Sequence, residues 1–254
     1  MTDDFLLETR GLTREFSGFT AVNKVDLRVR RHSIHALIGP NGAGKTTCFN
    51  LITKFLQPSS GAILLDGRDI TRTKPADVAR LGMVRSFQIS ATFPQLTSLE
   101  NVEVALQRSL GRSFHFWRSK RTLAPLREQA MTLLDDVGLA FAANRVVADL
   151  PYGQKRALEL ATTLALNPEM LLLDEPTAGM GREDVARTVA LIRRISPNRT
   201  ILMVEHNLSV VADLSDRITV LARGEILAEG AYGAISTDPR VKEAYMGKGE
   251  PAHV

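Results

Sequence analysis

One stretch restricts the fold more than any other: IHALIGPNGAGKTT, residues 34–47. Its second half matches the pattern G-x-x-x-x-G-K-[ST], which binds phosphate when a strand precedes it and a helix follows. The apolar run Ile34–Ile38 predicts that strand, and Lys45–Phe55 predicts the helix, which the segment PSSG at residues 58–61 stops. A chance glycine-rich turn is the alternative, and the full match in this context argues against it.

The residue types of this loop explain how it would hold phosphate. Glycines let the backbone curl so that its N–H groups point at phosphate oxygens, and the helix start adds the positive end of its dipole. We expect Lys45 to reach the β- and γ-phosphates of ATP and the Thr46 hydroxyl to ligate Mg²⁺. The predicted nucleotide-binding residues are Gly39, Pro40, Asn41, Gly42, Ala43, Gly44, Lys45, Thr46 and Thr47.

Two carboxylates follow a second apolar strand, in the segment LLLDEP at residues 171–176. This arrangement predicts Asp174 beside the Mg²⁺ ion and Glu175 near the γ-phosphate, where a water must be polarised. Alone, the segment also fits an ordinary acidic turn after a strand. Its combination with the phosphate loop favours the catalytic interpretation.

Two more polar residues end apolar strands. Gln88 follows Met83–Phe87, and His206 follows Ile201–Glu205 in the predicted strand that begins at Thr200. Each is an ordinary structural residue when taken alone. In a parallel sheet, however, the carboxyl ends of the strands converge at the ligand crevice. We therefore expect Gln88 to ligate Mg²⁺ or position water, and His206 to hydrogen-bond the γ-phosphate.

The segment LPYGQ at residues 150–154 lies directly before a predicted helix at Lys155–Leu166. Pro and Gly ahead of a helix leave its first N–H groups free and its dipole available to an anion. One chain fills one phosphate site with the loop at Gly39. A second anion-seeking helix start therefore points to a phosphate held by a second copy of the chain, although an ordinary helix cap would have the same sequence.

The rest of the chain predicts an α/β fold with a mainly parallel sheet, a small N-terminal antiparallel sheet and an inserted helical subdomain. We expect one domain over residues 5–254, with a catalytic core at 1–95 and 167–237, a helical insert at 96–166 and a C-terminal helix and tail at 238–254. The further expected strands are Leu12–Phe16, Val25–Val29, Ala62–Leu65, Met170–Leu173, Arg217–Leu221 and Glu225–Ala228. The further expected helices are Leu99–Leu106, Ala130–Val137 and Glu183–Ile195.

Composition indicates a globular cytoplasmic protein. The N-terminus lacks a secretion signal, no apolar run approaches the ~20 residues that cross a bilayer, and the single cysteine suits a reducing compartment. A net charge of +4 does not imply nucleic acid as a partner. The basic and aromatic segment 107–127 contains no acidic residue, and it is interpreted as a solvated face or as a contact with anionic lipid or a membrane partner.

The phosphate loop, Gln88, residues 150–154, residues 171–175 and His206 together resemble the ATP-binding cassette family over nearly the whole chain. The resemblance implies a head-to-tail dimer with two ATP molecules and Mg²⁺, in which Tyr152, Gly153 and Gln154 bind the partner's nucleotide. It also implies that Glu175 is the general base and that Phe16 stacks on adenine. The chain departs from the usual family pattern at Pro151, where Ser is common, at Tyr152, where Gly is common, and at Gly181, where Asp or Asn is common.

Within that family the chain looks most like ATPases of branched-chain amino-acid importers, on the segments 84–88, 150–154, 178–180 and 242–247. Importers of urea or short amides share several of these. The resemblance implies a second ATPase subunit, identical or not, two membrane permease subunits and, indirectly, a solute-binding protein. The expected location is the cytoplasmic face of the membrane. The rival functions are lipid export and a soluble ATPase acting on nucleic acid or ribosomes.

Overall fold

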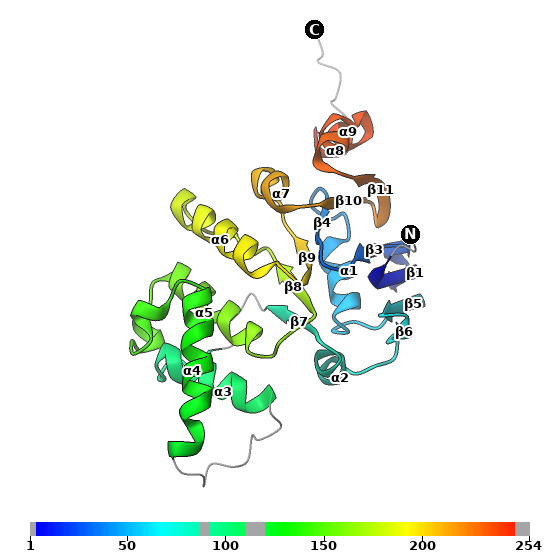
Figure 1. Ribbon diagram of the computed structural model, residues 1–254. Coiled ribbons are helices and arrows are strands. Elements are labelled where there is room, and N and C mark those ends of the chain that lie inside the picture. The colour runs from blue at the N-terminus through cyan, green and yellow to red at the C-terminus, as the bar shows by residue number, and fades with distance from the viewer. Residues whose placement is uncertain (1–3, 87–91, 110–119, 247–254) are drawn as a thin grey trace.

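A computed structural model describes residues 4–86, 92–109 and 120–246 of the chain. Within these ranges, the larger sheet has the strand order β11-β10-β4-β9-β8-β7, and every neighbouring pair is parallel except β10 with β11 (Figure 1). The predicted α/β fold with a mainly parallel sheet is thereby confirmed. Its strands are β4 (Ile34–Ile38), β7 (Met83–Ser86), β8 (Met170–Asp174), β9 (Thr200–Val204), β10 (Arg217–Ala222) and β11 (Glu225–Gly230).

The smaller N-terminal sheet is antiparallel, as predicted, and is built around one long strand. Its strands are β1 (Phe5–Phe16), β2 (Phe19–Val25), β3 (Arg28–Arg30), β5 (Ser60–Leu65) and β6 (Arg68–Asp69). The prediction of a single strand over Val25–Val29 was wrong. The hydroxyl of buried Thr9 interrupts the ladder there, because it donates to Val25 O and accepts from Leu27 N, both at 2.8 Å.

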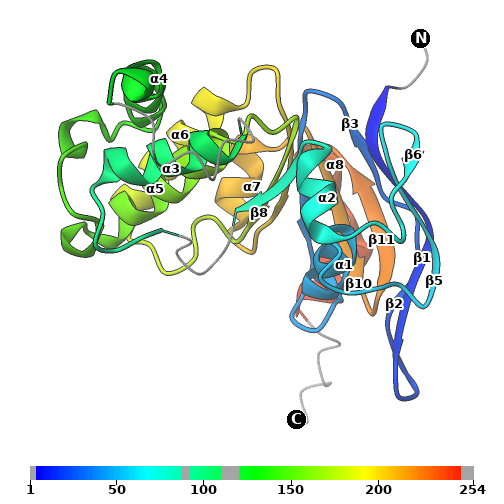
Figure 2. The same cartoon turned by 90° about the horizontal axis from the view of Figure 1, so that it is seen from below.

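Some helices cover the larger sheet, and others form a separate helical block. They are α1 (Lys45–Ile52), α2 (Pro75–Arg80), α3 (Ser98–Ser109), α4 (Lys120–Asp136), α5 (Tyr152–Leu164), α6 (Arg182–Ile195), α7 (Leu208–Leu214), α8 (Tyr232–Thr237) and α9 (Pro239–Met246). The block of α3, α4 and α5 contacts the rest of the molecule through β7 and α6 (Figures 1 and 2). None of the helices in the described ranges is both long and apolar enough to span a bilayer.

Two hydrophobic clusters lie on opposite faces of the larger sheet, as expected for parallel strands that are buried on both sides. Alternate residues of each strand point to opposite faces. On one face, α1 lies between the two sheets, where Phe49 and Ile52 share a cluster with Leu37 of β4 and Val22 of β2. Figure 2 shows α1 on the side of the molecule away from the helical block. The other face packs against α6, α7 and the helical block.

Each predicted helix differs from its observed bounds, most of all α4, which spans Lys120–Asp136 where Ala130–Val137 was predicted. The differences in α1 and α5 have a local cause. The first ends at Ile52 rather than Phe55, since Lys54 adopts a left-handed φ of 65° that a helix does not accommodate. The other begins at Tyr152 rather than Lys155, because Pro151 acts as the N-cap and its carbonyl accepts a 3.0 Å bond from Lys155 N. Residues 152–154 are therefore the first turn of α5 and not a loop that precedes it.

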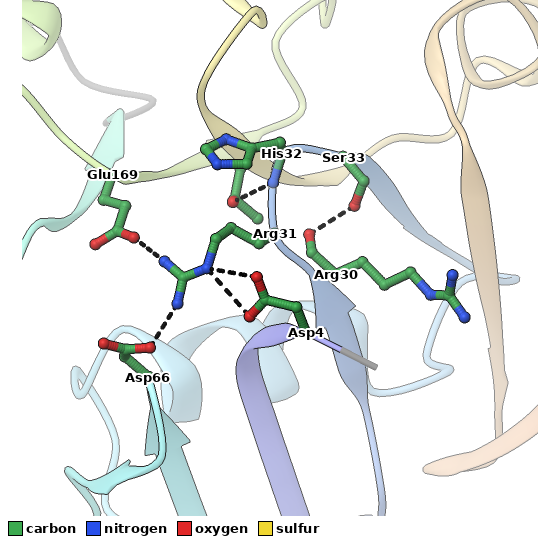
Figure 3. Close-up of polar contacts among 8 residues, drawn as sticks. Asp4, Arg30, Arg31, His32, Ser33, Asp66 and Glu169 are labelled. Carbon is green, nitrogen blue, oxygen red and sulfur yellow. Dashed lines mark hydrogen bonds and ion pairs between the residues drawn. The ribbon is translucent and has the colours of Figure 1, made fainter. Parts of the chain in front are cut away.

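Arg31 joins three segments near the amino-terminal ends of the parallel strands and precedes β4, whose other end leads into the phosphate loop. Figure 3 shows the contacts of Arg31. Its guanidinium lies 3.2 Å from both carboxylate oxygens of Asp4 and 2.5 Å from Asp66, and it also pairs with Glu169. Nearby, His32 N donates to the Thr200 hydroxyl at 2.9 Å. These contacts fix the two sheets to each other at the edge far from the expected site.

His35 is a fully buried polar residue in β4. Its Nε2 lies 2.8 Å from the Thr219 hydroxyl, which itself donates to Glu229 at 3.1 Å. Because that hydroxyl has only one proton, Nε2 must be the protonated ring nitrogen. Burial lowers the pKa of His35 to about 4, with nearby Glu229 opposing the shift and Arg217 adding to it.

The neutral state of His35 predicts a pH-dependent stability. Between pH 6.5 and pH 4 the unfolded chain binds a proton at His35 and the folded chain does not, so the stabilisation is complete above this window and is lost as pH falls through it. We expect the free energy of unfolding of the nucleotide-free protein to fall by about 2 kcal/mol more between pH 7 and pH 5 than that of His35→Gln. Urea denaturation at both pH values measures this, and equal pH dependence in the two proteins would contradict it.

Candidate active site

The phosphate loop connects β4 to α1 and is wedged between two other strands. Gly39 has φ +152°, and a Cβ there would lie 2.1 Å from the carbonyl oxygen of Leu221 in β10. Gly44 has φ +96°, and a Cβ there would lie 2.4 Å from the carbonyl oxygen of Ala21 in β2. Only glycine fits at either position, so the loop conformation is imposed by backbone contacts with both sheets.

Lys45 begins α1 and lies over its own loop. Its Nζ donates to Gly39 O at 2.7 Å and to Pro40 O at 2.9 Å. Burial lowers the pKa of Lys45, and the negative charge of Glu175 opposes that shift. Thr46 is exposed at the surface of the loop. The cation and the hydroxyl that the sequence assigns to phosphate and metal therefore lie together at the start of one helix.

The strand order brings the other predicted residues to the same edge. Strand β9 lies between β4 and β8, with Val204 in register with Leu37 on one side and with Asp174 on the other. The phosphate loop, the carboxylates after β8 and His206 after β9 thus emerge from three adjacent strands. His206 has a side chain that is 62% exposed and so is accessible to a ligand.

Glu175 has an unusual backbone conformation. Its φ is +46°, in the left-handed region that residues other than glycine rarely adopt. Its N–H donates to Val204 O at 2.9 Å, which fixes the peptide against the end of β9. Backbone strain of this kind is common at functional sites and is consistent with a side chain that is held in a required direction.

Asp174 is buried and paired with a cation of the same chain. The Arg85 guanidinium of β7 forms an ion pair with Asp174 Oδ2 and also donates to Asn50 at 2.8 Å. It lies 5.1 Å from the ring centroid of Phe49 and 5.3 Å from that of Phe55. The ion pair with Arg85 involves Oδ2 of Asp174, whose side chain is 7% exposed.

The structure does not bring the start of α5 to the phosphate loop of the same chain. Tyr152, Gly153 and Gln154 lie in the helical block, and both views show this block separated from α1 by strands of the larger sheet (Figures 1 and 2). The Tyr152 side chain is 52% exposed. A Cβ on Gly153 would lie 3.1 Å from Asp184 Oδ1 of α6, so a larger residue would displace that carboxylate.

Phe16 ends β1 and is 39% exposed. The Arg14 guanidinium lies 4.5 Å from the centroid of its ring. The same hairpin contacts the phosphate loop through Ala21, as described above. Gln88 falls in residues 87–91, outside the described part of the chain, as do residues 110–119 of the basic segment 107–127.

The sequence analysis missed Arg85 and Glu205. No pattern in a short strand marks Arg85 as the partner of a carboxylate that is 89 residues away. Glu205 had a usable signal, because it follows β9 as Asp174 ends β8, and the rule applied to strand ends covers it as well as His206.

Comparison with known proteins identifies the family. A model described as ABC transporter matches residues 22–178, more than half of the chain. The chain belongs to the ABC transporter family. A second model, described as branched-chain amino acid ATP-binding cassette transporter, matches residues 225–251.

Relatives of this ABC protein match it over nearly its whole length. The high-affinity branched-chain amino acid transport ATP-binding protein BraF of Pseudomonas aeruginosa is 40% identical over 253 residues, which cover 96% of this chain and 98% of BraF. LivG of Escherichia coli K12, described in the same words, is 38% identical over 250 residues, with 96% and 98% covered.

Solved structures agree with the fold and with nucleotide binding. The ADP conformation of MJ1267, an ATP-binding cassette of an ABC transporter, superposes with a TM-score of 0.83 at 28% identity and covers 96% of this chain and 99% of that one. A nucleotide-free cassette from an ABC transporter gives a TM-score of 0.80 at 28% identity, with 96% and 100% covered. This ABC protein binds nucleotide, and ATP hydrolysis is its expected activity.

Loss of Arg85 from this ABC cassette is predicted to destabilise the nucleotide-free protein. Arg85→Met leaves Asp174 buried without its cation, which costs about 3 kcal/mol of folding free energy. Urea denaturation in the absence of Mg²⁺ measures the loss. The matched control is Arg80→Met, because Arg80 pairs with Asp77 at 2.6 Å but the two side chains are 79% and 48% exposed. We expect the control to cost at most about 0.5 kcal/mol, and equal losses would contradict the buried pair.

Proposed function

We propose that the chain is the ATP-hydrolysing, energy-coupling subunit of a membrane importer for branched-chain amino acids or related small polar solutes such as urea and amides. The observation that best supports ATP hydrolysis is the strand order β4-β9-β8. This order brings a phosphate loop, two carboxylates and a histidine to one edge of the sheet. The importer is supported by the BraF and LivG relatives and by the match at residues 225–251. These relatives favour an importer over a lipid exporter or a soluble ATPase acting on nucleic acid.

In this proposal the phosphates lie in the loop at residues 39–47. The backbone N–H groups and Lys45 bind the β- and γ-phosphates. To do so, Lys45 must exchange its bonds to Gly39 O and Pro40 O for bonds to phosphate oxygens. Phe16 stacks on adenine at the exposed edge of the β1–β2 hairpin. The Arg14 guanidinium already lies over the Phe16 ring, so this ring would have the guanidinium as a second stacking partner beside adenine.

The residues at the site fit a Mg²⁺ ion. The exposed Thr46 hydroxyl and the Asp174 carboxylate are hard oxygen ligands, and Asp174 already attracts a cation in the form of Arg85. The described residues contain no cluster of three or more acidic, histidine or cysteine side chains that would hold a metal alone. That pattern suits Mg²⁺, which is usually bound by one or two protein ligands together with phosphates. When bound, Mg²⁺ would neutralise charge on the phosphates, with Gln88 proposed as a further ligand.

We assign the chemical step to Glu175 and His206. Glu175 accepts a proton from the attacking water, which is the task of a general base. His206 donates a hydrogen bond to the γ-phosphate, where negative charge accumulates as the bond to the leaving group lengthens. Gln88 positions the water or the metal.

A second cassette would complete the site. The first turn of α5, at residues 152–154, exposes its N–H groups away from the phosphate loop of its own chain, and helix starts bind phosphate. We propose a head-to-tail dimer, of identical or different chains, in which this turn contacts the partner's nucleotide. Because Pro151 has no side-chain hydroxyl, the backbone N–H groups of this turn carry the contact.

The proposed partners and location of the chain follow from the importer function. Two membrane permease subunits would hold the dimer at the cytoplasmic face of the membrane, and a solute-binding protein would act through them. Nucleic acid is not an expected partner. Within the chain we propose a single domain at 5–254, with the core at 1–95 and 167–237, the helical insert at 96–166 and the tail at 238–254.

Replacement of Glu175 by Gln separates binding from hydrolysis. The amide cannot accept the proton of water, so we expect turnover to fall by about 100-fold or more while ATP still binds. With MgATP the variant should accumulate as a dimer, because hydrolysis no longer separates the subunits. Steady-state phosphate release and size-exclusion chromatography measure the two effects. Turnover close to that of the wild type would contradict the role of Glu175.

The transport role is tested by isolating the chain with its native complex from membranes. We expect two permease subunits to copurify and a branched-chain amino acid, with its binding protein, to stimulate ATP hydrolysis. Urea and a short amide serve as the matched alternatives. Stimulation by nucleic acid in the absence of membrane subunits would overturn the transport function but not the ATPase activity.

A further inference from the structure

Glu205 is a fully buried carboxylate directly after β9, and the catalytic roles proposed above do not use it. It lies between two loops. One follows Asp174 and Glu175 at the end of β8, and the other contains His206. A carboxylate taken out of water is costly unless hydrogen bonds replace its hydration. The donors around Glu205 therefore show what this residue holds in place.

Each carboxylate oxygen of Glu205 accepts two hydrogen bonds. Oε1 accepts from the backbone N–H of Thr177 at 3.1 Å and from the Thr177 hydroxyl. Oε2 accepts from the N–H of His206 at 2.8 Å and from the N–H of Asn207 at 2.9 Å. The nearest ionisable nitrogen in the described residues is His206 Nδ1, at 3.8 Å. Backbone and hydroxyl donors from the two loops, and no Lys or Arg, thus satisfy this charge.

These bonds connect the two proposed catalytic residues. Thr177 is two residues after Glu175, and Glu175 N itself donates to Val204 O at the end of β9. On the other side, Asn207 is the N-cap of α7 and accepts from Ser209 N at 3.1 Å. The carboxylate therefore joins the turn after Glu175, the histidine loop and the start of α7. Hydrogen bonds to a charged acceptor are stronger than neutral ones.

We propose that Glu205 is a positioning residue that holds His206 and the Glu175–Thr177 turn in one fixed arrangement, so that both proposed catalytic groups meet the γ-phosphate together. The inference rests on the proposed function of His206 and Glu175. Glu205 itself is fully buried, and its four hydrogen bonds come from protein groups, so the proposed effect is indirect. Its effect on hydrolysis is transmitted through the backbone N–H groups that it holds.

Glu205→Gln is the sharpest substitution, because it keeps the shape of the side chain. The amide nitrogen of Gln is a donor only. In one orientation it would face the N–H groups of His206 and Asn207, and in the other it would face the N–H group and hydroxyl of Thr177. In either orientation one of the two loops loses its hydrogen-bond acceptor. Glu128 in α4 is exposed, and Glu128→Gln removes one charge without removing a buried acceptor. It is the matched control.

The test compares nucleotide affinity with turnover in the full chain. For Glu205→Gln we expect kcat to fall at least about tenfold while the Kd for ATP changes less than about threefold, because the phosphate loop is untouched. Calorimetric titration with ATP and steady-state phosphate release measure the two quantities. A buried residue with only a structural role would lower stability and affinity together. Wild-type turnover in Glu205→Gln would overturn the inference.

A double-mutant cycle with His206→Ala shows whether the effect passes through His206. If it does, adding Glu205→Gln to His206→Ala should lower kcat by clearly less than it does in the wild type, with the remaining loss coming from the Glu175–Thr177 turn that Glu205 also holds. Full additivity in the presence of an impaired His206→Ala would overturn the inference and leave the proposed function intact. Wild-type turnover in His206→Ala would instead overturn the proposed role of the histidine, and the inference with it.

Thr177 gives a second route if Glu205→Gln does not fold. Thr177→Val removes one hydroxyl donor and retains the backbone N–H, while Thr177→Ser retains both. We expect Thr177→Val to lower kcat by more than Thr177→Ser, with little change in the Kd for ATP. Equal kcat values for the two variants would overturn the inference.

Discussion

Direct contact between backbones at Gly39 and Gly44 is the constraint on which the rest of the structure depends. The phosphate loop reaches the carbonyl of Leu221 on one side and that of Ala21 on the other, with no room for a Cβ at either point. The loop therefore does more than precede α1. It joins the parallel sheet to the antiparallel one and sets the position of α1 between them. A cradle for phosphate that is already formed in this way costs little conformational entropy when the nucleotide binds.

Two buried carboxylates beside this loop are stabilised by different means, and the difference matches their proposed tasks. Asp174 is paired with Arg85, a cationic side chain whose place beside the carboxylate a metal ion could take or share. Glu205 is held by N–H groups and a hydroxyl of two loops, which cannot leave without moving the backbone. The first arrangement suits a ligand site and the second suits a joint between elements. Both lie at the edge where parallel strands end, because only there do loops from several strands meet.

The sequence predicts the elements that are buried on both faces and those that match a fixed spacing of residue types. Ile34–Ile38 and the phosphate loop are examples, because an apolar run and a glycine spacing leave few alternatives. Short helices such as α2 and α7 escaped prediction, since six or seven residues show too little periodicity. The break after Val25 depends on the hydroxyl of Thr9, which is 16 residues away. Arg85 was missed because its partner Asp174 comes from a distant segment that only the fold brings together, whereas the rule for strand ends could have found Glu205.

The left-handed backbone conformation of Glu175 means that folding stability and the proposed catalytic activity favour different residues at this position. Glycine or asparagine adopts that conformation more readily than glutamate, so either one would relieve strain on the order of 1 kcal/mol. Selection for heat resistance alone would therefore tend to replace the side chain to which we assign the role of general base. A protein engineer who ranks substitutions by folding energy would find this position among the attractive ones, and the role proposed for Glu175 predicts that the resulting cassette would be more stable but would turn over very slowly.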